Sequence, residues 1–483
     1  MPVFTEENIQ RIFGHEAAED EDINRLTEYY FKNQTYLNMR APLPLRILVG
    51  HKGIGKSALF SVAIQEDAKE GLLSISLRPD DISEVRDDQT DFNAQIKSWK
   101  TGLLRIIEKK VVENLGIARS DMQTKGQATG KALAVIKASV QPYLKDKIDF
   151  NPLQKAFTER FLKANALNVY IDDLDRGWQG RKTDISRISA LLNAVRDLCN
   201  SSGELRFRIA LRSDVYFAVR TSDESTDKLE GSVIWYSWIN HEILALLVKR
   251  IETFFGRNAD EKVLMRMKQN ELATYLTPVM TPRFMGKGKW ENAPIHRVLM
   301  SLIRKRPRDL VKLCTSAARH AHLSQRDIII TDDFQSVFED YSQARVQDTI
   351  NEHRTELPDI ERLLMNMKPT KRLPTSIDAF SFTTDKLLLK VQRIMEQGKF
   401  RFSNGKEATA REIAAFMYKI NFLTARKELP GEYVDRKYFE ENRYLSSTLA
   451  DFGYDWEIHP AYRWALQPDN VANLYNDIKL QAD

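Results

Sequence analysis

The sequence contains very little cysteine and no long hydrophobic run. Its 483 residues include two cysteines, Cys199 and Cys314, which lie far apart and outside any CxxC pattern. We therefore expect neither a disulfide framework nor a zinc site, and a reducing cytoplasm as the compartment. No stretch approaches the roughly 20 apolar residues that cross a bilayer. The acidic N-terminus also lacks the basic start and apolar run of a signal peptide, so we expect no membrane association and no export.

The chain also has no large net charge of either sign. The net charge of +5 is small for this length and does not by itself indicate nucleic-acid binding. Hydrophobic residues make up 42% of the chain and charged residues 29%, without a low-complexity tract, which is typical of a globular protein. A chain of 483 residues is too long for one ordinary core, so two or three domains are expected.

What the sequence does have is a phosphate-binding loop. Residues 45–57 read LRILVGHKGIGKS and match the pattern G-x-x-x-x-G-K-[ST]. Glycines let the backbone turn its N–H groups toward phosphate oxygens, the lysine reaches the β- and γ-phosphates of ATP, and the serine hydroxyl binds Mg²⁺. The predicted nucleotide-contacting residues are Gly50, Lys52, Gly53, Ile54, Gly55, Lys56, Ser57 and Ala58.

A pattern with four fixed positions also occurs by chance, so its surroundings matter. Ile47, Leu48 and Val49 precede the loop as a strand, and residues 58–60 continue the apolar face of a helix after it. A strand, a loop and a helix in this order are the setting that the motif requires. The sequence therefore predicts a nucleotide site.

The rest of the chain alternates between strand-like and helical segments. Further strands are predicted at 72–77, 167–171, 205–211 and 233–236, with helices between them, which is typical of a parallel α/β sheet covered on both faces. We expect three parts. Residues 1–250 form an ATPase core, which includes a helical N-terminal leader and a helical insert at about 90–163. Residues 251–345 form a helical lid, and residues 346–483 form a winged-helix-like C-terminal domain.

An acidic pair follows the predicted strand at 167–171. In a P-loop protein, a carboxylate in this position holds the Mg²⁺ hydration shell, which we assign to Asp172. Its neighbour Asp173 could orient or deprotonate the attacking water. The alternative is a solvated acidic loop. The apolar strand before the pair, and the P-loop upstream of it, favour the metal site.

These segments also carry a family resemblance. The sequences IDDLDRGW at 171–178, GHKGIGKS at 50–57 and LRSD at 211–214 together resemble P-loop ATPases of the STAND and KAP type, in particular a bacterial group called FunZ-like. RKRPRDL at 304–310 and IHPAYRWAL at 458–466 are similar to segments of the same group. The resemblance extends from about residue 5 to residue 470.

The resemblance implies an ASCE (AAA-like) sheet in which the P-loop strand lies beside the strand that ends at Arg212. It implies that Arg212 senses the γ-phosphate, although a surface arginine at a strand end fits the residues equally well. Arg308 is a candidate second sensor in the lid, and the competing interpretation is a solvated helix start after Pro307. Asp175 and Arg176 could serve a subunit interface or supply an arginine finger, and the sequence does not decide between these.

The sequence departs from many active ATPases at one position. A glutamate often follows the metal-binding aspartate, whereas this chain has Asp173. A shorter carboxylate can still polarise water, so the sequence predicts slow rather than motor-like hydrolysis.

Three functions are compatible with these residues. The first is a regulatory ATPase whose lid and C-terminal module respond to ATP, in bacterial defence against phage or in stress signalling, as the resemblance suggests, with a second copy or a partner effector protein supplying the output. The second is a DNA-associated ATPase that uses the basic run 304–308 and a winged helix with Lys419, Arg426, Lys427 and Arg436. The third is a nucleotide-binding scaffold without turnover.

Overall fold

The structure is a computed structural model. It describes residues 3–83, 85, 91–115, 133, 136–138, 141, 160–161, 163–369, 379–430, 433–443, 445, 453–466 and 471–482. Most of the predicted insert beyond Leu115 lies outside the described residues. Among those that are described, no helix is long and hydrophobic enough to cross a bilayer.

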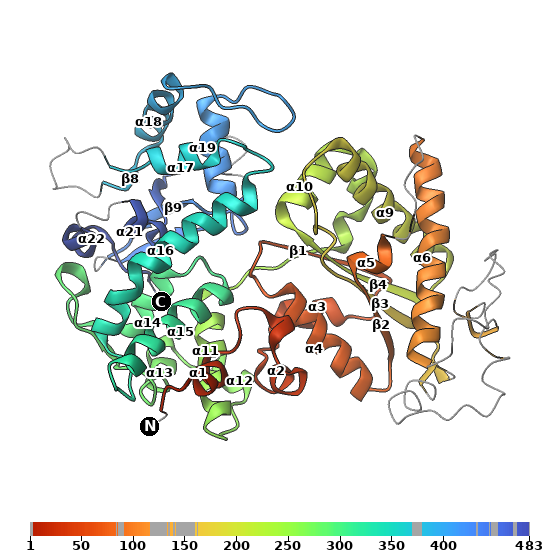
Figure 1. Cartoon of the computed structure of the whole chain (residues 1–483), viewed down its shortest axis with the longest axis horizontal. Coiled ribbons are helices and arrows are strands. Elements are labelled where there is room, and N and C mark those ends of the chain that lie inside the picture. The colour runs from red at the N-terminus through yellow and green to blue at the C-terminus, as the bar shows by residue number, and fades with distance from the viewer. Residues whose placement is uncertain are drawn as a thin grey trace. The chain divides into compact units, whose positions relative to one another are not determined.

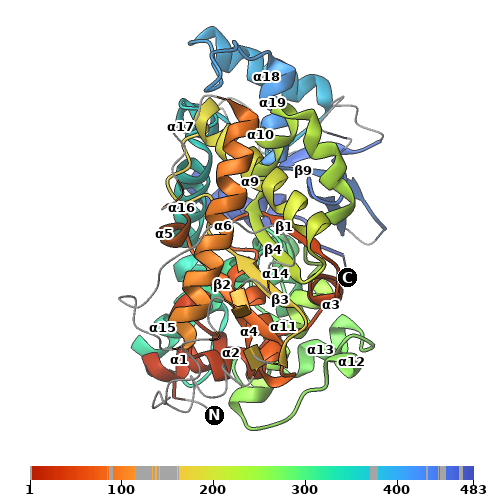
Figure 2. The same cartoon turned by 90° about the vertical axis from the view of Figure 1, so that its right-hand side faces the viewer.

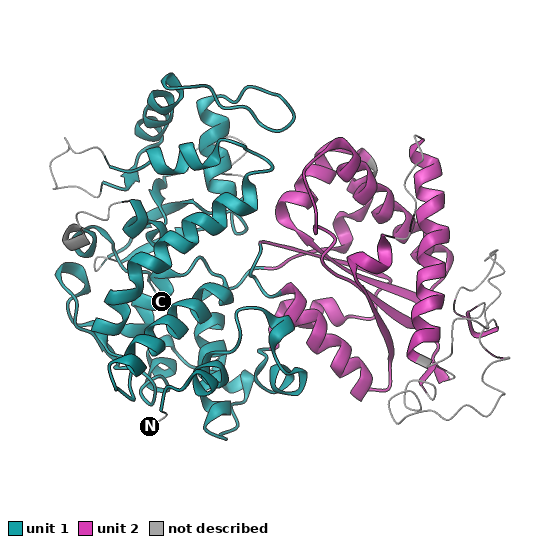
Figure 3. Cartoon of the chain, viewed as in Figure 1, with its two compact units in different colours: residues 1–31, 52–55, 237–483 teal, residues 32–51, 56–236 magenta. Residues whose placement is uncertain are grey.

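The chain divides into two compact units (Figure 3). Unit 1 consists of residues 1–31, 52–55 and 237–483, and unit 2 of residues 32–51 and 56–236. The division passes through the P-loop, because residues 52–55 group with unit 1 while the residues on either side of them group with unit 2. Each unit is described separately.

Unit 2 is built on a parallel sheet, with the strand order β2-β3-β4-β1-β5 in its described residues (Figure 1). Placing β4 between β1 and β3 is the order of an ASCE-type P-loop ATPase, so the predicted fold class is confirmed. The strands lie close to the predicted positions: β1 (Leu45–Gly50), β2 (Leu73–Leu77), β3 (Leu167–Ile171), β4 (Leu205–Arg212) and β5 (Val233–Trp235).

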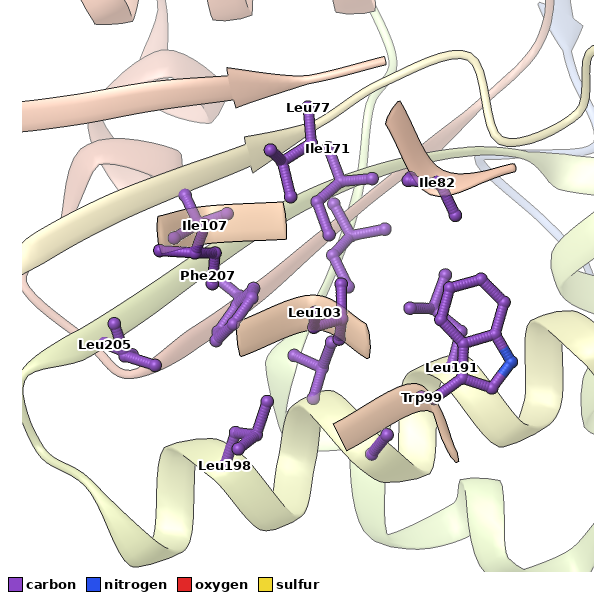
Figure 4. Close-up of a cluster of buried hydrophobic side chains, with 14 of the residues drawn as sticks. Leu77, Ile82, Trp99, Leu103, Ile107, Ile171, Leu191, Leu198, Leu205 and Phe207 are labelled. Atoms are coloured by element: carbon purple, nitrogen blue, oxygen red, sulfur yellow. The ribbon is translucent and has the colours of Figure 1, made fainter. Parts of the chain in front are cut away.

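Helices cover both faces of this sheet (Figures 1 and 2). Successive side chains of a strand point to opposite faces. In β3, Val169 joins the apolar core under α6 and α9, whereas Tyr170 packs edge-on against Phe60 of α4, with ring centroids 5.2 Å apart. Figure 4 shows part of the core on the α6 and α9 side. The described helices of unit 2 are α3 (Gln34–Arg40), α4 (Lys56–Lys69), α5 (Pro79–Ile82), α6 (Phe92–Leu115), α9 (Lys182–Ser201), α10 (Ser213–Ser222) and the 3-10 segment η3 (Glu224–Ser232).

Unit 1 contains the N-terminal helices and most of the C-terminal half. Helix α1 buries Ile9, Ile12 and Phe13 and packs against α11 and α15. Unit 1 also contains two short strands, β6 (Arg283–Phe284) and β7 (Ala293–Pro294), within the range 251–345 that we predicted as a helical lid. The helices and strands up to residue 366 are α1 (Glu6–Phe13), η1 (Ala18–Asp20), α2 (Ile23–Tyr29), α11 (Asn240–Phe254), α12 (Glu261–Leu264), α13 (Gln269–Thr274), β6 (Arg283–Phe284), η4 (Gly288–Trp290), β7 (Ala293–Pro294), α14 (Ile295–Leu302), α15 (Pro307–Leu323), α16 (Thr331–His353) and α17 (Ile360–Asn366).

The C-terminal part of unit 1 is a winged-helix-like module. Two helices precede a β9–β10 hairpin, and the sheet has the order β10-β9-β11-β8 among the described residues. The sequence has β-like segments with aromatic residues near 433–439 and 453–466. The second is a strand only as far as Ile458, because Pro460 begins a helical turn there. The elements are β8 (Ser381–Phe382), α18 (Thr384–Glu396), α19 (Ala410–Lys419), β9 (Leu423–Glu428), β10 (Val434–Lys437), β11 (Asp455–Ile458), η5 (Pro460–Tyr462), α21 (Arg463–Leu466) and α22 (Val471–Asp477).

Candidate nucleotide-binding site

The P-loop has the backbone that its glycines predict. Gly53 and Gly55 have φ angles of 78° and 103°, in the left-handed region that glycine adopts without steric cost. Helix α4 begins directly at Lys56, so Ser57 and Ala58 lie in its first turn, where backbone N–H groups lack partners within the helix. Such a helix start attracts anions. The local structure thus fits a phosphate group.

Lys56 folds back over its own loop. Its ammonium Nζ donates hydrogen bonds to the carbonyl oxygens of Gly50, at 2.9 Å, and His51, at 3.1 Å. Both acceptors are neutral backbone groups, and a phosphate oxygen is a stronger acceptor for a charged donor. The side chain is therefore placed at the loop and can exchange these carbonyls for phosphate.

His51 is a loop residue whose structural role we did not predict. Its ring is buried, and Nδ1 lies 3.1 Å from the hydroxyl of Ser213, the first residue of α10. This contact links the end of β1 to the end of β4 across neighbouring strands. No pattern in the sequence pairs these two positions, because they are 162 residues apart.

The predicted metal and water-activating residues follow β3. Asp172 accepts a hydrogen bond from the Asp173 backbone N–H at 2.9 Å, and Asp173 has a left-handed φ of 57°. Partial burial raises the pKa of Asp173, and the negative charges of Asp172 and Asp175 raise it further. A carboxylate with a raised pKa is a better base for water than an ordinary one. That its sequence neighbour Asp172 and the hydroxyl of Ser57 bind Mg²⁺ stays a prediction.

Arg212 lies at the same edge of the sheet. In the β1–β4 register it stands opposite Gly50, where the P-loop begins. Its guanidinium donates two hydrogen bonds to Asp214, from Nε at 3.0 Å and from Nη2 at 2.6 Å, and one to Asp175 at 3.2 Å. The Arg212 guanidinium is therefore not a solvated group at a strand end, because it is hydrogen-bonded to two carboxylates. Asp175, which we considered for a subunit interface, is one of its partners within the chain.

Residues 52–54 of the P-loop, which belong to unit 1, contact other residues of that unit. The Lys52 backbone N–H donates to Glu352 Oε1 at 3.2 Å, and Arg306 Nη1 donates to the Lys52 carbonyl at 3.2 Å and lies 3.3 Å from Glu352 Oε2. The indole of Trp238 donates to the Ile54 carbonyl at 2.8 Å. The sequence pattern gave no signal for these contacts of Glu352, Arg306 and Trp238.

Arg308 also reaches the P-loop, but with its aliphatic part. A Cβ placed on Gly53 would lie 3.1 Å from Arg308 Cδ, so this arginine stem occupies the space that the glycine leaves. Its Nε donates to the Glu16 carbonyl at 3.1 Å. A role as second phosphate sensor stays a prediction that requires this guanidinium to change partner.

The basic residues considered for nucleic acid are largely internal. Arg304 and Arg306, from the run 304–308, are 3% exposed and pair with Asp309 and Glu352 respectively. In the winged-helix-like module, Arg426 and Arg436 are also buried, and both pair with Glu457. Lys419 pairs with Glu356 at 2.7 Å, and of the residues in this group only Lys427 lies on an exposed strand end. These four arginines therefore have acidic partners inside the fold, and nucleic-acid binding by this chain stays a prediction.

Comparisons with known proteins agree with the sequence motifs in one region. Residues 241–350 match the family described as the FunZ-associated C-terminal helical domain. This region runs from α11 to most of α16. No curated protein matches the sequence.

Solved structures that align with most of this chain include Walker-type ATPases. A Walker-type ATPase of Pyrococcus abyssi is 10% identical, with 90% of this chain and 95% of that chain covered and a TM-score of 0.41. The ORC2 protein of Aeropyrum pernix, in ADPNP and ADP complexes, is 14% identical, with coverages of 93% and 92% and a TM-score of 0.38. At these scores the assignment of the fold rests on the strand order and the P-loop of this chain.

Proposed function

We propose that this protein binds Mg–ATP at the P-loop and hydrolyses it slowly, as a regulatory switch. The supporting observation is the convergence, at one edge of the unit 2 sheet, of Lys56, Asp172, Asp173 and Arg212. These side chains supply a phosphate-binding cation, a metal ligand, a base and a phosphate sensor. ATP and Mg²⁺ are accordingly the proposed cofactors.

Each side chain has a part in the proposed reaction. Lys56 leaves the loop carbonyls for the β- and γ-phosphates. Ser57 and Asp172 would hold Mg²⁺, which when bound neutralises charge on the phosphates. Asp173 accepts a proton from the attacking water, and its raised pKa suits this role. Arg212 stabilises negative charge that develops on the transferred phosphoryl group.

We propose that bound nucleotide changes the partners of two charged side chains, Arg212 and Glu352. Phosphate competes with Asp175 and Asp214 for Arg212. Within unit 1, the Glu352 carboxylate accepts from the Lys52 backbone N–H in the P-loop, and a phosphate close to that N–H would repel it. Because ATP and ADP differ in the γ-phosphate, they would bias these contacts differently.

The test of the enzyme is phosphate release. We expect wild-type protein with Mg–ATP to release phosphate above background, and Lys56→Ala and Asp173→Asn to fall to background. Lys69→Ala is the matched control, because Lys69 lies in the last turn of the same helix α4 and is exposed. If wild type and both variants release phosphate at the same rate, the protein is a nucleotide-binding scaffold without turnover.

The role in the cell is proposed on the FunZ-like resemblance and the FunZ-associated match to residues 241–350. We place the switch in a bacterial cytoplasm, in defence against phage or in stress signalling, with a second copy or an effector protein as partner. Measuring the mass in solution with ATP analogue, with ADP and without nucleotide tests the partner. A mass that increases only with the ATP analogue supports self-assembly, and a constant monomer mass rejects it.

A further inference from the structure

The end of helix α16 contacts both the P-loop and the winged-helix-like module, and the proposed function involves only the first of these contacts. We call residues 352–356 the α16 end. Glu352 and His353 complete the helix, and residues 354–356 form the turn that follows it. P-loop residues 52–55 and the winged-helix-like module both belong to unit 1, so all the contacts of the α16 end described below lie within that unit.

On the P-loop side, the contact is made by a buried carboxylate. Glu352 Oε1 accepts a hydrogen bond from the Lys52 backbone N–H at 3.2 Å, and Glu352 Oε2 lies 3.3 Å from Arg306 Nη1. Backbone N–H groups of a P-loop are the donors that bind phosphate. Because Glu352 is buried, solvent screens its charge little. Glu352 therefore competes with phosphate for one of these donors and is repelled by phosphate charge.

On the other side, the α16 end holds helix α19. The Glu356 carboxylate lies 2.7 Å from Lys419 Nζ, and the Glu356 backbone carbonyl accepts from the Ser403 N–H at 3.0 Å. The His353 ring packs edge-on against the ring of Phe416, with centroids 6.2 Å apart. Phe416 and Lys419 belong to α19, the helix directly before the β9–β10 hairpin. The segment that contacts the P-loop thus also fixes α19.

The turns of α16 before this segment are anchored in the interior. Arg345 pairs with Asp309 of α15, and the Thr349 hydroxyl lies 3.1 Å from the Tyr462 hydroxyl. All four side chains are buried. Repulsion at Glu352 therefore displaces the α16 end more than the body of the helix, with the pivot after Thr349.

We propose that the α16 end relays the occupancy of the P-loop to α19. Repulsion between the γ-phosphate and Glu352 loosens the contact of Glu352 with Lys52. Because the residues that contact α19 follow Glu352 within four positions, the same displacement loosens the contacts with α19. Helix α19 is then held less tightly when ATP is bound than when ADP is bound. This inference rests on the proposed nucleotide site but not on hydrolysis.

The first test uses the reciprocity of coupled equilibria. If ATP loosens the ion pair between Lys419 and Glu356, removing this pair beforehand makes ATP bind more tightly. We expect Lys419→Ala to lower the Kd for the non-hydrolysable analogue ADPNP about twofold to fivefold, the factor that corresponds to a partly exposed ion pair. The Kd for ADP should change less. Calorimetry on the full chain measures both constants.

The matched control is Lys406→Ala. Lys406 pairs with Glu412 of α19 at 2.6 Å, so this substitution also removes an ion pair of α19, but one that does not involve the α16 end. We expect the Kd for ADPNP to stay unchanged in Lys406→Ala.

The second test observes α19 directly by hydrogen exchange. With ADPNP, the amides of α19 should exchange about twofold to fivefold faster than with ADP, because loss of the same contacts lowers the free energy of local opening. The amides of α13, in the same unit, should exchange equally with both nucleotides. Glu352→Gln, which lacks the charge that phosphate repels, should lose the difference at α19.

The outcomes separate the relay from the nucleotide site. If calorimetry detects binding of neither nucleotide, the proposed site fails and the relay fails with it. If both nucleotides bind, two results overturn the relay alone. One is a Kd for ADPNP that Lys419→Ala alters no more than Lys406→Ala does. The other is exchange at α19 that does not differ between ADPNP and ADP, or a difference that persists in Glu352→Gln folded by circular dichroism.

Discussion

Two clusters of arginine and aspartate in this protein have the same chemistry and opposite surroundings. The strand-end cluster consists of Arg212, Asp175 and Asp214, whose side chains are 14%, 21% and 7% exposed. The buried cluster in unit 1 consists of Arg304, Asp309 and Arg345, whose side chains are 1–2% exposed. The first has one arginine for two carboxylates, and the second has two arginines for one carboxylate.

The difference shows that burial decides what an ion cluster can do. In the buried cluster, Arg304 grips Asp309 through two nitrogens, at 2.7 and 3.0 Å, and also donates to Thr349 and Tyr462. These bonds join α15, α16 and η5, and a ligand has no access to them. In the strand-end cluster the arginine has a surplus of acceptors at the edge where the P-loop begins, so phosphate can replace one of them. The buried cluster holds the fold together, and the strand-end cluster is suited to change.

The largest expected effect comes from the buried cluster. Burial alone would raise the pKa of Asp309, but the charges of Arg304 and Arg345 outweigh it and hold this pKa far below its usual range. Asp309→Asn leaves the buried Arg304 guanidinium without a carboxylate and Arg345 with only Asp348 as its acidic partner, so we expect a loss of about 3–5 kcal/mol in the free energy of unfolding, measured in urea. The matched control is Asp348→Asn, which removes a 50% exposed partner of Arg345 and should cost less than about 1 kcal/mol. Equal losses of stability for Asp309→Asn and Asp348→Asn would show that burial does not make an ion pair more important for the stability of this protein.

The strand-end cluster is expected to affect rate more than stability. Arg212→Ala should lower the rate of phosphate release by about tenfold to a hundredfold, because the transition state loses a charge-stabilising donor. It should lower the free energy of unfolding less than Asp309→Asn does. Arg220→Ala, which removes a partly exposed arginine paired with Glu230, serves as control. A stability loss as large as that of Asp309→Asn, with an unchanged rate per folded molecule, would assign both clusters to structure.

The surroundings of the buried cluster predict a dependence of stability on pH. His459 accepts from the Ala461 N–H at Nδ1, so its proton is on Nε2, 2.7 Å from the Tyr438 hydroxyl. Burial, together with the nearby charge of Arg436, lowers the pKa of His459 well below its usual value. The unfolded chain therefore takes up a proton as pH falls below about 6.5 while the folded chain does not. We expect the free energy of unfolding to fall by about 1 kcal/mol between pH 7.5 and 5.5.

The measurement is urea unfolding at both pH values for wild type and for His459→Asn, whose side-chain oxygen can replace the Nδ1 acceptor. The variant should be less stable at both pH values but should show a smaller difference between them. An identical difference in the two proteins would mean that another group titrates.

The smallest expected effect is a shift in the pH profile of hydrolysis. As a base, Asp173 must be ionised, so the rate should increase as pH rises through its raised pKa. The groups that act on it are Asp172, Asp175, Arg176 and Lys56. Asp175→Asn removes one negative charge and should move the acid limb of the profile to lower pH, by less than about one unit. An acid limb that does not shift would show that the charge of Asp175 does not affect the ionisation of Asp173.

Local features of this protein could be read from the sequence because they depend on neighbouring residues. The glycines of the P-loop, the start of α4 and the strands of the parallel sheet follow from spacing within a few residues. In the C-terminal part the same reasoning failed after Ile458, where tertiary packing stabilises the short helical segment at 460–466. Contacts such as His51 with Ser213, or Lys52 with Glu352, join residues more than 150 positions apart, and one sequence contains no signal for them.

The basic run 304–308 shows the difference between what the sequence specifies and what only the tertiary structure specifies. The sequence by itself determined that a P-loop, an acidic strand end and a parallel sheet are present, because short-range sterics and alternating hydrophobicity specify them. Only the tertiary structure decided which arginines remain near the phosphate loop and which are neutralised in the interior. The physical reason is that the energy of a charge depends on its solvent exposure and its partners, and the fold sets both.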